Sequence, residues 1–377
     1  MAILSQSEFL KTNWSMIQGK KTFSPISLLL AFFSFLYGLG VRLRLISYRR
    51  KQKRSLPGFV VSIGNLTVGG TGKTPAACML AEWALDEKYS VAVLSRGYGG
   101  RYKTKTLEVS DGQNIYAGPA EAGDEPYLLA RKLPGVPVII SKKRYLAGAL
   151  AHKKFGINFY ILDDGFQHLD LERDLDLVLM DGSDPFGNGH LLPWGPLREP
   201  VDQLERADAF IITRAHHGVT GDDLTGFLKK RFPDKPLFLS DHAPERIIFP
   251  NKSETYDPEF LRGKPVVAFA GIARPEVFIE TLKNLGVELV FFRAFEDHHI
   301  FKHNEIHDLI NKKERLRANY LLTTEKDWVR MENFAHECPD LAYLTIKFIF
   351  FSARNKFFRM VKERSGESRK SAFGMRK

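Results

Sequence analysis

The sequence contains only two cysteines in 377 residues, Cys78 and Cys338. Two cysteines this far apart provide neither a disulfide framework nor the close spacing of a zinc site. Their scarcity suits a protein of a reducing compartment. The chain is long enough for two domains with substantial cores, and it shows no internal repeat.

The body of the chain lacks the positive charge that its ends carry. The net charge of the whole sequence is +11. Residues 1–54 carry +9 and residues 353–377 carry +7, which leaves −5 for residues 55–352. A mildly acidic body argues against a nucleic-acid groove. The basic ends are compatible with an anionic membrane surface.

Twenty residues near the N-terminus lack any charge. They run from Thr22 to Val41, and seven Lys/Arg follow in the next thirteen residues. About 20 apolar residues can span a bilayer, and a cleaved signal peptide is disfavoured because the basic cluster follows the apolar run. A single span, an interfacial helix and a buried helix are all open. Membrane contact is favoured, and a span would leave the body in the cytoplasm.

The stretch GNLTVGGTGKTP (64–75) lacks one residue of a phosphate-binding loop. The pattern G-x-x-x-x-G-K-[ST] has glycine where Thr67 stands. An expected strand precedes the loop and an expected helix, at about 72–88, follows it. The remaining glycines allow backbone N–H groups to face phosphate, the lysine can reach the β- and γ-phosphates, and the last threonine can hold Mg²⁺. The residues expected at the nucleotide are Thr67, Val68, Gly69, Gly70, Thr71, Gly72, Lys73 and Thr74.

Apolar, β-branched runs alternate with helical stretches beyond this loop. They predict an α/β fold, namely a P-loop NTPase-like domain with a mostly parallel sheet covered on both faces. Residues 235–260 are Pro-rich and are expected to be irregular, and a second α/β pattern begins at residue 264. The expected segments are a membrane-associating helix and basic segment (1–54), a P-loop kinase domain (55–245), a smaller α/β domain (246–350) and a basic tail (351–377).

Two polar stretches follow expected strands of the first domain. Asp163 and Asp164 end the run FYILDD, where Mg²⁺ is held in this fold class. A strand-end turn is the alternative, but buried paired carboxylates are costly unless they bind something. In LLPWGPLREP (191–200), Arg198 could contact phosphate and Glu199 could assist the metal. A surface salt bridge is the alternative.

Two further stretches contain candidate acid–base groups. Asp124 precedes a helical run, where aspartate is also a common N-cap, and the residues alone favour the cap. Asp297, His298 and His299 follow a strand of the second domain. No further His or Cys lies at zinc-ligand spacing, so base or orienting duty is the functional interpretation.

Together these stretches resemble the tetraacyldisaccharide 4'-kinase family, the lipid A 4'-kinases of Gram-negative bacteria. GNLTVGGTGKTP is the sharpest match, since that family uses a phosphate loop whose first glycine is replaced. The other matching stretches follow in the family's order and are SRGYGG (95–100), GDEP (123–126), LDDGFQH (162–168), GPLREP (195–200), DHH (297–299) and TEKD (324–327).

The resemblance implies an enzyme that transfers phosphate from ATP, with Mg²⁺, to the 4'-hydroxyl of a lipid A disaccharide 1-phosphate precursor. It implies Asp124 as the base and His298, rather than His299, as the residue that orients it. TEKD is expected near the nucleotide. By the same resemblance Arg198 contacts phosphate, Thr74, Asp163, Asp164 and Glu199 serve the metal, and Ser95, Arg96, Gly97 and Tyr98 line the lipid site.

The resemblance also implies a location. The protein is expected at the bacterial inner membrane, with its catalytic body on the cytoplasmic face and its N-terminal segment in contact with membrane lipids. No nucleic acid and no protein partner is expected. The alternatives are a different P-loop enzyme with a membrane anchor and a non-enzymatic membrane or nucleic-acid binding protein.

Overall fold

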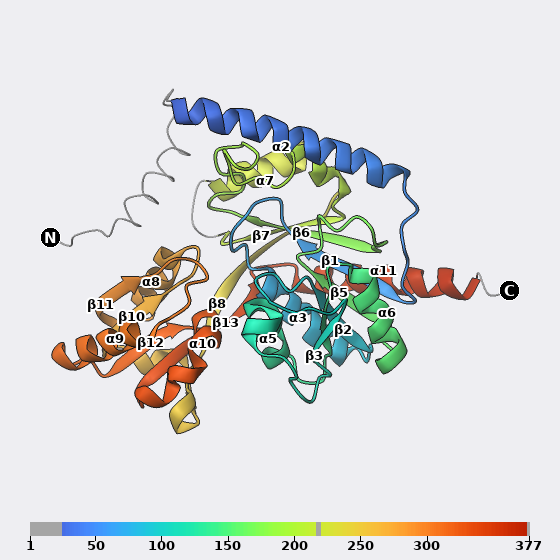
Figure 1. Cartoon of the computed structure of the whole chain (residues 1–377). Helices are drawn as coiled ribbons and strands as arrows, with labels where there is room; N and C mark the ends of the chain where they lie inside the picture. Colours follow the sequence, from blue (N-terminus) through green and yellow to red (C-terminus); the bar gives the residue numbers. More distant parts are fainter. Residues whose placement is uncertain (1–24, 216–219, 375–377) are drawn as a thin grey trace. The chain divides into compact units, whose positions relative to one another are not determined.

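The computed structural model describes residues 25–215 and 220–374. Residues 1–24 of the expected membrane segment and 375–377 of the expected tail lie outside the described residues. The chain divides into two compact units, and Figure 1 labels their elements. We call them the first unit (Met1–Thr71, Asp164–Ser240, Phe351–Lys377) and the second unit (Gly72–Asp163, Asp241–Phe350).

The first unit contains a parallel sheet in the order β8–β7–β6–β1. Its strands are β1 (Phe59–Gly64), β6 (Leu175–Asp181), β7 (Ala209–Thr213) and the beginning of β8 (Leu237–Phe249). Every residue of β1, β6 and β7 is buried, as nearly continuous apolar strands require. Gly64 lies in register with Val178, and Asp181 with Thr213. The carboxyl ends of these strands therefore meet at one edge.

Helices cover both faces of this sheet. Phe210 and Ile212 of β7 share a core cluster with Leu224 of α7 (Thr220–Arg231). The intervening Ile211 is in register with Phe238 of β8, whose ring contacts Phe357 of α11 (Arg354–Gly374) with centroids 5.2 Å apart. Since successive strand residues point to opposite faces, α7 and α11 lie on opposite sides. A short 3-10 helix, η1 (Val201–Arg206), precedes β7.

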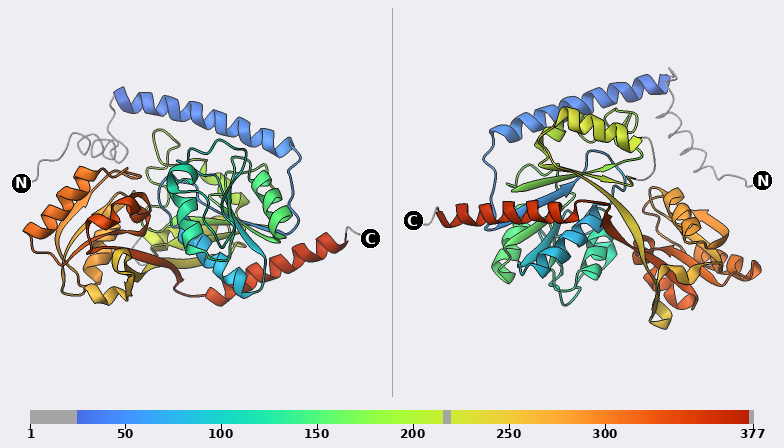
Figure 2. Two further views of the ribbon diagram at one scale, coloured as in Figure 1. Left: turned by 60° about the horizontal axis from the view of Figure 1, so that its bottom comes forward. Right: turned by 180° about the vertical axis from the view of Figure 1, so that it is seen from behind.

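A long apolar helix, α2 (Pro25–Arg50), lies along the first unit. Figures 1 and 2 show it, in blue, running beside the layer that contains α7. Only a narrow stripe of it is buried, and Ser34 Oγ in that stripe donates a hydrogen bond to Leu191 O at 2.8 Å. Among the described helices, α2 alone is long and apolar enough to cross a membrane. Its exposed apolar residues are Ile26, Leu28, Leu29, Phe32, Phe33, Phe35, Leu36, Leu39, Leu43 and Ile46.

The second unit begins with a group of strands in the order β5–β2–β4–β3. The first three strands are parallel, and β3 is an antiparallel edge. The strands are β2 (Val91–Ser95), β3 (Leu107–Ser110), β4 (Val138–Ile140) and β5 (Phe159–Asp163). The helices around them are α3 (Lys73–Asp86), α4 (Pro119–Ala122), α5 (Asp124–Lys132) and α6 (Arg144–Phe155).

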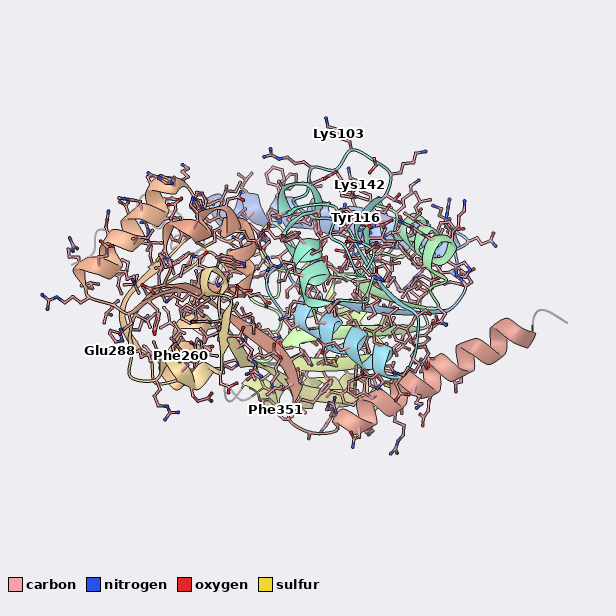
Figure 3. The ribbon with its side chains drawn as sticks, turned by 90° about the horizontal axis from the view of Figure 1, so that it is seen from below. Lys103, Tyr116, Lys142, Phe260, Glu288 and Phe351 are labelled. Carbon is pink, nitrogen blue, oxygen red and sulfur yellow. The ribbon has the colours of Figure 1, made fainter. Side chains whose placement is uncertain are left out.

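A second parallel group in the same unit has the order β11–β10–β12–β13. Alternate residues of β10 pack against α8 on one face and against α9 and α10 on the other. Figure 2 shows these helices, in orange, around their strands, and Figure 3 labels Phe260 and Glu288 on this part of the chain. The elements are β9 (Glu254–Tyr256), β10 (Pro265–Ala270), α8 (Pro275–Asn284), β11 (Glu288–Ala294), α9 (His303–Arg315), β12 (Tyr320–Thr324), α10 (Glu325–Met331) and β13 (Leu341–Phe350), with 3-10 turns η2 (Pro250–Lys252), η3 (Pro258–Leu261) and η4 (Glu332–Glu337).

The structure confirms the α/β class and its mostly parallel strand pairing. The expectation of an irregular stretch at 235–260 is wrong, because the 13-residue strand β8 occupies much of it. The prolines of this stretch suggested irregular structure, since proline cannot donate to a strand ladder; the one inside β8 is Pro244. It lies between residues 237–239, which pair with β7, and residues 247–249, which pair with β9. The proline therefore interrupts neither of these ladders.

Candidate active site

The phosphate loop leads from β1 into the first turn of α3. Gly72, directly before the helix, has a φ of 84°, a left-handed conformation that favours glycine. A Cβ at Gly72 would also lie 2.0 Å from His242 Nε2, whereas a Cβ at Gly70 would meet nothing within 4 Å. Lys73 and Thr74 open α3, where backbone N–H groups lack intrahelical acceptors and favour an anion. This geometry is that of a phosphate-binding helix N-terminus.

Thr67, which stands where glycine is usual, belongs to a short antiparallel bridge. It pairs with Leu197, and Val68 N donates a hydrogen bond to Pro196 O at 2.8 Å. Thr67 is buried and does not have a positive φ, so its position makes no demand for glycine. The bridge explains the substitution and ties the start of the loop to the GPLREP segment.

The two carboxylates at the end of β5 have different surroundings. Asp163 is buried, and its Oδ2 accepts a hydrogen bond from Ser95 Oγ at 3.3 Å. Asp164 pairs with Arg198, whose Nη1 lies 2.9 and 2.8 Å from the two carboxylate oxygens. The structure therefore brings together Asp163 with Ser95, and Asp164 with Arg198.

Both residues of this loop form salt bridges, Arg198 with the partly exposed Asp164 and Glu199 with Arg206. Glu199 has a side chain only 3% exposed, and it pairs with Arg206 Nη2 at 2.5 Å. The Arg206 guanidinium also lies over the ring of Phe166, 4.3 Å from its centroid. Burial lowers the pKa of Arg206, and the Glu199 charge opposes that shift. Adjacent residues in the chain thus enter separate ion pairs.

Arg214 braces the phosphate loop, a role that the sequence did not indicate. Its Nη2 donates a hydrogen bond to Gly70 O at 2.8 Å, and its guanidinium pairs with Asp181 at the end of β6. Thr213 Oγ1 approaches Thr71 O at 3.3 Å. The ends of β6 and β7 thereby fix two carbonyl groups of the loop. The only signal in the sequence was a polar pair, Thr213 and Arg214, at the end of an apolar strand.

Asp124 is the first residue of α5 and not its N-cap. Gly123 takes the cap position with a φ of 90°, and no side chain caps the helix, so the expected capping role is wrong. Instead, Asp124 Oδ2 lies 3.1 Å from His298 Nδ1. His299 Nε2 lies 2.8 Å from Glu305 Oε2. Of the two neighbouring histidines, His298 is the one that reaches Asp124.

The TEKD segment packs around this pair of residues. Thr324 caps α10 by accepting a hydrogen bond from Asp327 N, and Lys326 Nζ lies 3.4 Å from His298 Nε2. Glu325 pairs with Lys132 of α5 at 2.8 Å. Sequence reasoning did not identify the contacts of Lys326 and Glu325, because their partners lie 28 and 193 positions away in the chain. The expected nearness of TEKD to the nucleotide remains a prediction.

The SRGYGG segment presents two of its four expected lipid-site residues on the surface. Tyr98 is 76% exposed, and its ring centroid lies 6.5 Å from that of His298. Arg96 is also exposed, whereas Ser95 is buried behind Asp163. Gly97 has a φ of 72°, and a Cβ there would lie 2.6 Å from Ile140. The segment therefore makes a tight turn that presents Tyr98 beside His298.

Within residues 25–215 and 220–374, no three His, Cys, Asp or Glu side chains gather as a metal site. Mg²⁺ usually takes one or two carboxylates and completes its shell with phosphates and water. The expected donors are the Thr74 hydroxyl and the carboxylates of Asp163, Asp164 and Glu199. Hard oxygen donors of this kind suit Mg²⁺. They fit an ion that arrives with a nucleotide better than one caged by protein.

The chain matches the family model of LpxK, tetraacyldisaccharide-1-phosphate 4'-kinase, over residues 26–365. It is 42% identical to the tetraacyldisaccharide 4'-kinase of Syntrophus aciditrophicus over 344 residues, which cover 89% of this chain and 92% of the relative. Identity to the enzyme of Pelobacter propionicus is 41% over 319 residues, 84% and 86% of the two chains. The crystal structure of LpxK from Aquifex aeolicus, in complex with ATP, superimposes with a TM-score of 0.72 at 32% identity, over 90% of this chain and 99% of that chain. The chain therefore belongs to the tetraacyldisaccharide 4'-kinase family.

Proposed function

We propose that this protein transfers the γ-phosphoryl group of ATP to the 4'-hydroxyl of tetraacyldisaccharide 1-phosphate in lipid A biosynthesis. Membership of the family supports the reaction. The observation that carries the chemistry is the contact of 3.1 Å between Asp124 Oδ2 and His298 Nδ1. It pairs a carboxylate at a helix start with an imidazole, which is the arrangement of a general base and its orienting group.

Asp124 is the proposed base. A sugar hydroxyl is a weak nucleophile, so a base must accept its proton as the phosphoryl group moves. His298 contacts Asp124 Oδ2, and Asp124 Oδ1 makes no hydrogen bond or ion pair with the described residues. We therefore assign Oδ1 as the atom that accepts the proton of the sugar hydroxyl. His298 fixes the orientation of the carboxylate.

The nucleotide is proposed to bind at the phosphate loop. Thr67 to Gly72 line the phosphates and supply backbone N–H groups, except Val68, whose N–H is bonded to Pro196 O. Lys73 reaches the β- and γ-phosphates, and Arg198 contacts phosphate oxygens. Thr74, Asp163, Asp164 and Glu199 would hold Mg²⁺, directly or through water. When bound, Mg²⁺ neutralises charge on the phosphates during transfer. Arg198 already presents its guanidinium from a carboxylate clamp at Asp164.

The lipid is proposed to lie against the SRGYGG segment, with Arg96 and Tyr98 as its surface contacts. The exposed apolar face of α2 is proposed to enter the interface of the bacterial inner membrane from the cytoplasmic side. A helix that lies along the protein and exposes its apolar face suits an interfacial position. The division of the chain at residues 54, 245 and 350 also remains our prediction.

The experiment is a transfer assay in detergent with Mg-ATP and tetraacyldisaccharide 1-phosphate, followed by mass spectrometry. The expected product is the bisphosphorylated lipid, with the new phosphate at the 4' position. ATP hydrolysis without phosphorylation of the lipid would instead support a different P-loop enzyme. Binding of ATP without either reaction would overturn the catalytic proposal.

A further inference from the structure

A buried arginine, which the proposed mechanism does not use, lies against Asp124. Arg330 Nε is 3.0 Å from Asp124 Oδ2, the same oxygen that His298 Nδ1 approaches. The side chain of Arg330 is 5% exposed and that of Asp124 is 18% exposed. One carboxylate oxygen therefore faces two basic groups, and one of them carries a permanent charge.

The backbone beside His298 holds the same guanidinium. Arg330 Nη1 donates to Gly271 O at 3.1 Å and to His299 O at 3.2 Å. His298 N in turn lies 3.2 Å from Gly271 O. Arg330 thus contacts the carboxylate of Asp124 and two backbone carbonyls beside His298, those of Gly271 and His299. Movement of this guanidinium would disturb both partners.

Asp327 anchors Arg330 from behind. Its carboxylate is wholly buried, lies 3.4 Å from Arg330 Nη1, and accepts the Gly271 N–H at 3.1 Å. Thr324 Oγ1 lies 2.6 Å from it as well. Burial raises the pKa of Asp327, and the charge of Arg330 opposes that rise. A buried ion pair of this kind holds its members in one geometry, because separating them leaves an uncompensated charge.

Packing alone does not account for Arg330. Its Nε and Nη2 are buried and make no hydrogen bond with the described residues. Buried donors in proteins normally have a hydrogen-bond acceptor. Arg330 therefore uses only some of its N–H groups in hydrogen bonds that stabilise the fold. Arg330 Nε and Asp124 Oδ2 form an ion pair, but they are not aligned as a hydrogen bond.

Other charged groups near Asp124 contact one another. Lys326 Nζ lies 3.6 Å from Glu125 Oε1 and 3.9 Å from Asp297 Oδ1. Asp297 Oδ2 lies 3.9 Å from His298 Nε2. Among the described residues, none of these three side chains forms an ion pair with Asp124. The permanent positive charge at Asp124 is therefore that of Arg330.

We infer that Arg330, anchored by Asp327, is a positioning residue for phosphoryl transfer. It holds Oδ2 of Asp124 in place, so that Oδ1 is the oxygen that accepts the proton. The hydroxyl O–H bond breaks, the proton goes to Oδ1, and the hydroxyl oxygen bonds to the γ-phosphorus. The bond from that phosphorus to the bridging oxygen breaks, and ADP leaves with the electron pair. The inference rests on the proposed function, because it takes Asp124 as the base.

The test compares pH–rate profiles of lipid phosphorylation for full-length variants. Arg330→Gln removes the charge, so we expect kcat to fall about tenfold to a hundredfold with little change in the KM for ATP. We expect the acidic limb of kcat/KM to move up by about one to three pH units. Arg330→Lys keeps a charge and should return the limb towards its wild-type position.

The matched control is Arg131→Gln. Arg131 also lies on α5 and pairs with Glu332, at the start of η4, but it does not contact Asp124. This variant should keep the wild-type kcat and profile. Asp327→Asn is the second test variant. It leaves Arg330 charged and removes its counter-charge, so the limb should move towards lower pH, which a merely structural role does not predict.

The outcomes separate the inference from the proposed function. If Asp124→Asn is inactive while Arg330→Gln keeps the wild-type profile, the Arg330 inference is wrong and the base assignment stands. A fall in kcat with an unshifted limb contradicts it too. If Arg330→Gln does not fold, an unshifted limb in Asp327→Asn decides against the inference. If Asp124→Asn keeps wild-type rates, the base assignment and the inference fail together.

Discussion

His298 Nδ1 lies 3.1 Å from Asp124 Oδ2, although 174 positions separate the two residues in the chain. His298 itself has a φ of 59°, a conformation uncommon for a residue with a side chain and one that clusters at functional sites. The fold thus keeps an unfavourable backbone geometry at the residue that faces the proposed base. The adjacent His299 turns to Glu305 and provides a natural comparison.

We predict that His298→Ala lowers kcat about a hundredfold, since loss of an acid–base partner typically costs 10²–10⁴-fold. ATP affinity should stay unchanged, because the phosphate loop is intact. His299→Ala, the matched control, should leave kcat within about threefold of the wild type, since its partner is Glu305. Steady-state transfer kinetics with both variants check this, and equal losses would contradict the assignment of His298.

The contacts of Arg214 with Gly70 O and Asp181 hold the phosphate loop, and they predict an effect on nucleotide binding. Arg214→Gln removes the donor to Gly70 O and breaks the pair with Asp181. We expect ATP to bind about tenfold more weakly, or about 1.4 kcal/mol, because the loop carbonyls are no longer fixed. Arg231→Gln breaks an exposed pair with Asp202 and should have little effect. Titration calorimetry measures the ATP affinity of both variants. An unchanged affinity in Arg214→Gln would show that Arg214 does not hold the loop for nucleotide binding.

The elements that could be predicted from the sequence are those that a short stretch of residues specifies by itself. β1 and α3 were predicted because the strand is continuously apolar and the glycines follow it at once. β8 was missed because its part of the chain is rich in proline. Arg214 and Arg330 were missed because an arginine after a strand or on a helix is usually solvated. Their partners, Gly70 and Asp124, lie 144 and 206 positions away in the chain. The pairing of Asp124 with His298 came from the family resemblance and not from any local pattern.

The lowered pKa of Glu305 predicts that this residue contributes to the free energy of unfolding in a pH-dependent way. Burial raises its pKa, but hydrogen bonds from His299 and from Lys302 N outweigh burial, so the pKa is lowered. A lowered carboxyl pKa stabilises the fold above the unfolded value of about 4.3, and this gain is lost as the pH falls through the folded pKa. Glu305→Gln should therefore cost about 1 kcal/mol at pH 7 and almost nothing at low pH.

Denaturant unfolding at several pH values checks this expectation. Glu288→Gln is the control, since Glu288 is exposed and Figure 3 shows it on the second unit. That variant should be as stable as the wild type throughout. A destabilisation of Glu305→Gln that does not change with pH would show that the charge of Glu305 is not involved.

The exposed face of α2 predicts membrane binding. Phe32 and Phe35 are 56% and 69% exposed, and each contributes about 1.5–3 kcal/mol when fully buried. Replacing both with aspartate should reduce binding to anionic phospholipid vesicles at least about a hundredfold and leave ATP binding intact. Substitution is preferred to deletion of residues 1–54, because Val41 and Leu45 pack against Leu169 of the body.

Vesicle flotation measures the result. Asn284→Asp with Asn304→Asp adds the same charge at two exposed positions of α8 and α9 and should float like the wild type. Unchanged flotation of the α2 variant would exclude this face as the membrane contact.

The most direct test of the account is a single-turnover measurement of phosphate transfer to tetraacyldisaccharide 1-phosphate by the wild type and by Asp124→Asn. We expect rapid formation of the 4'-phosphorylated lipid by the wild type. For the variant we expect a rate constant about 10²–10⁴ times lower, with ATP still bound. Equal rate constants for the two proteins would show that Asp124 is not the base and would contradict the account.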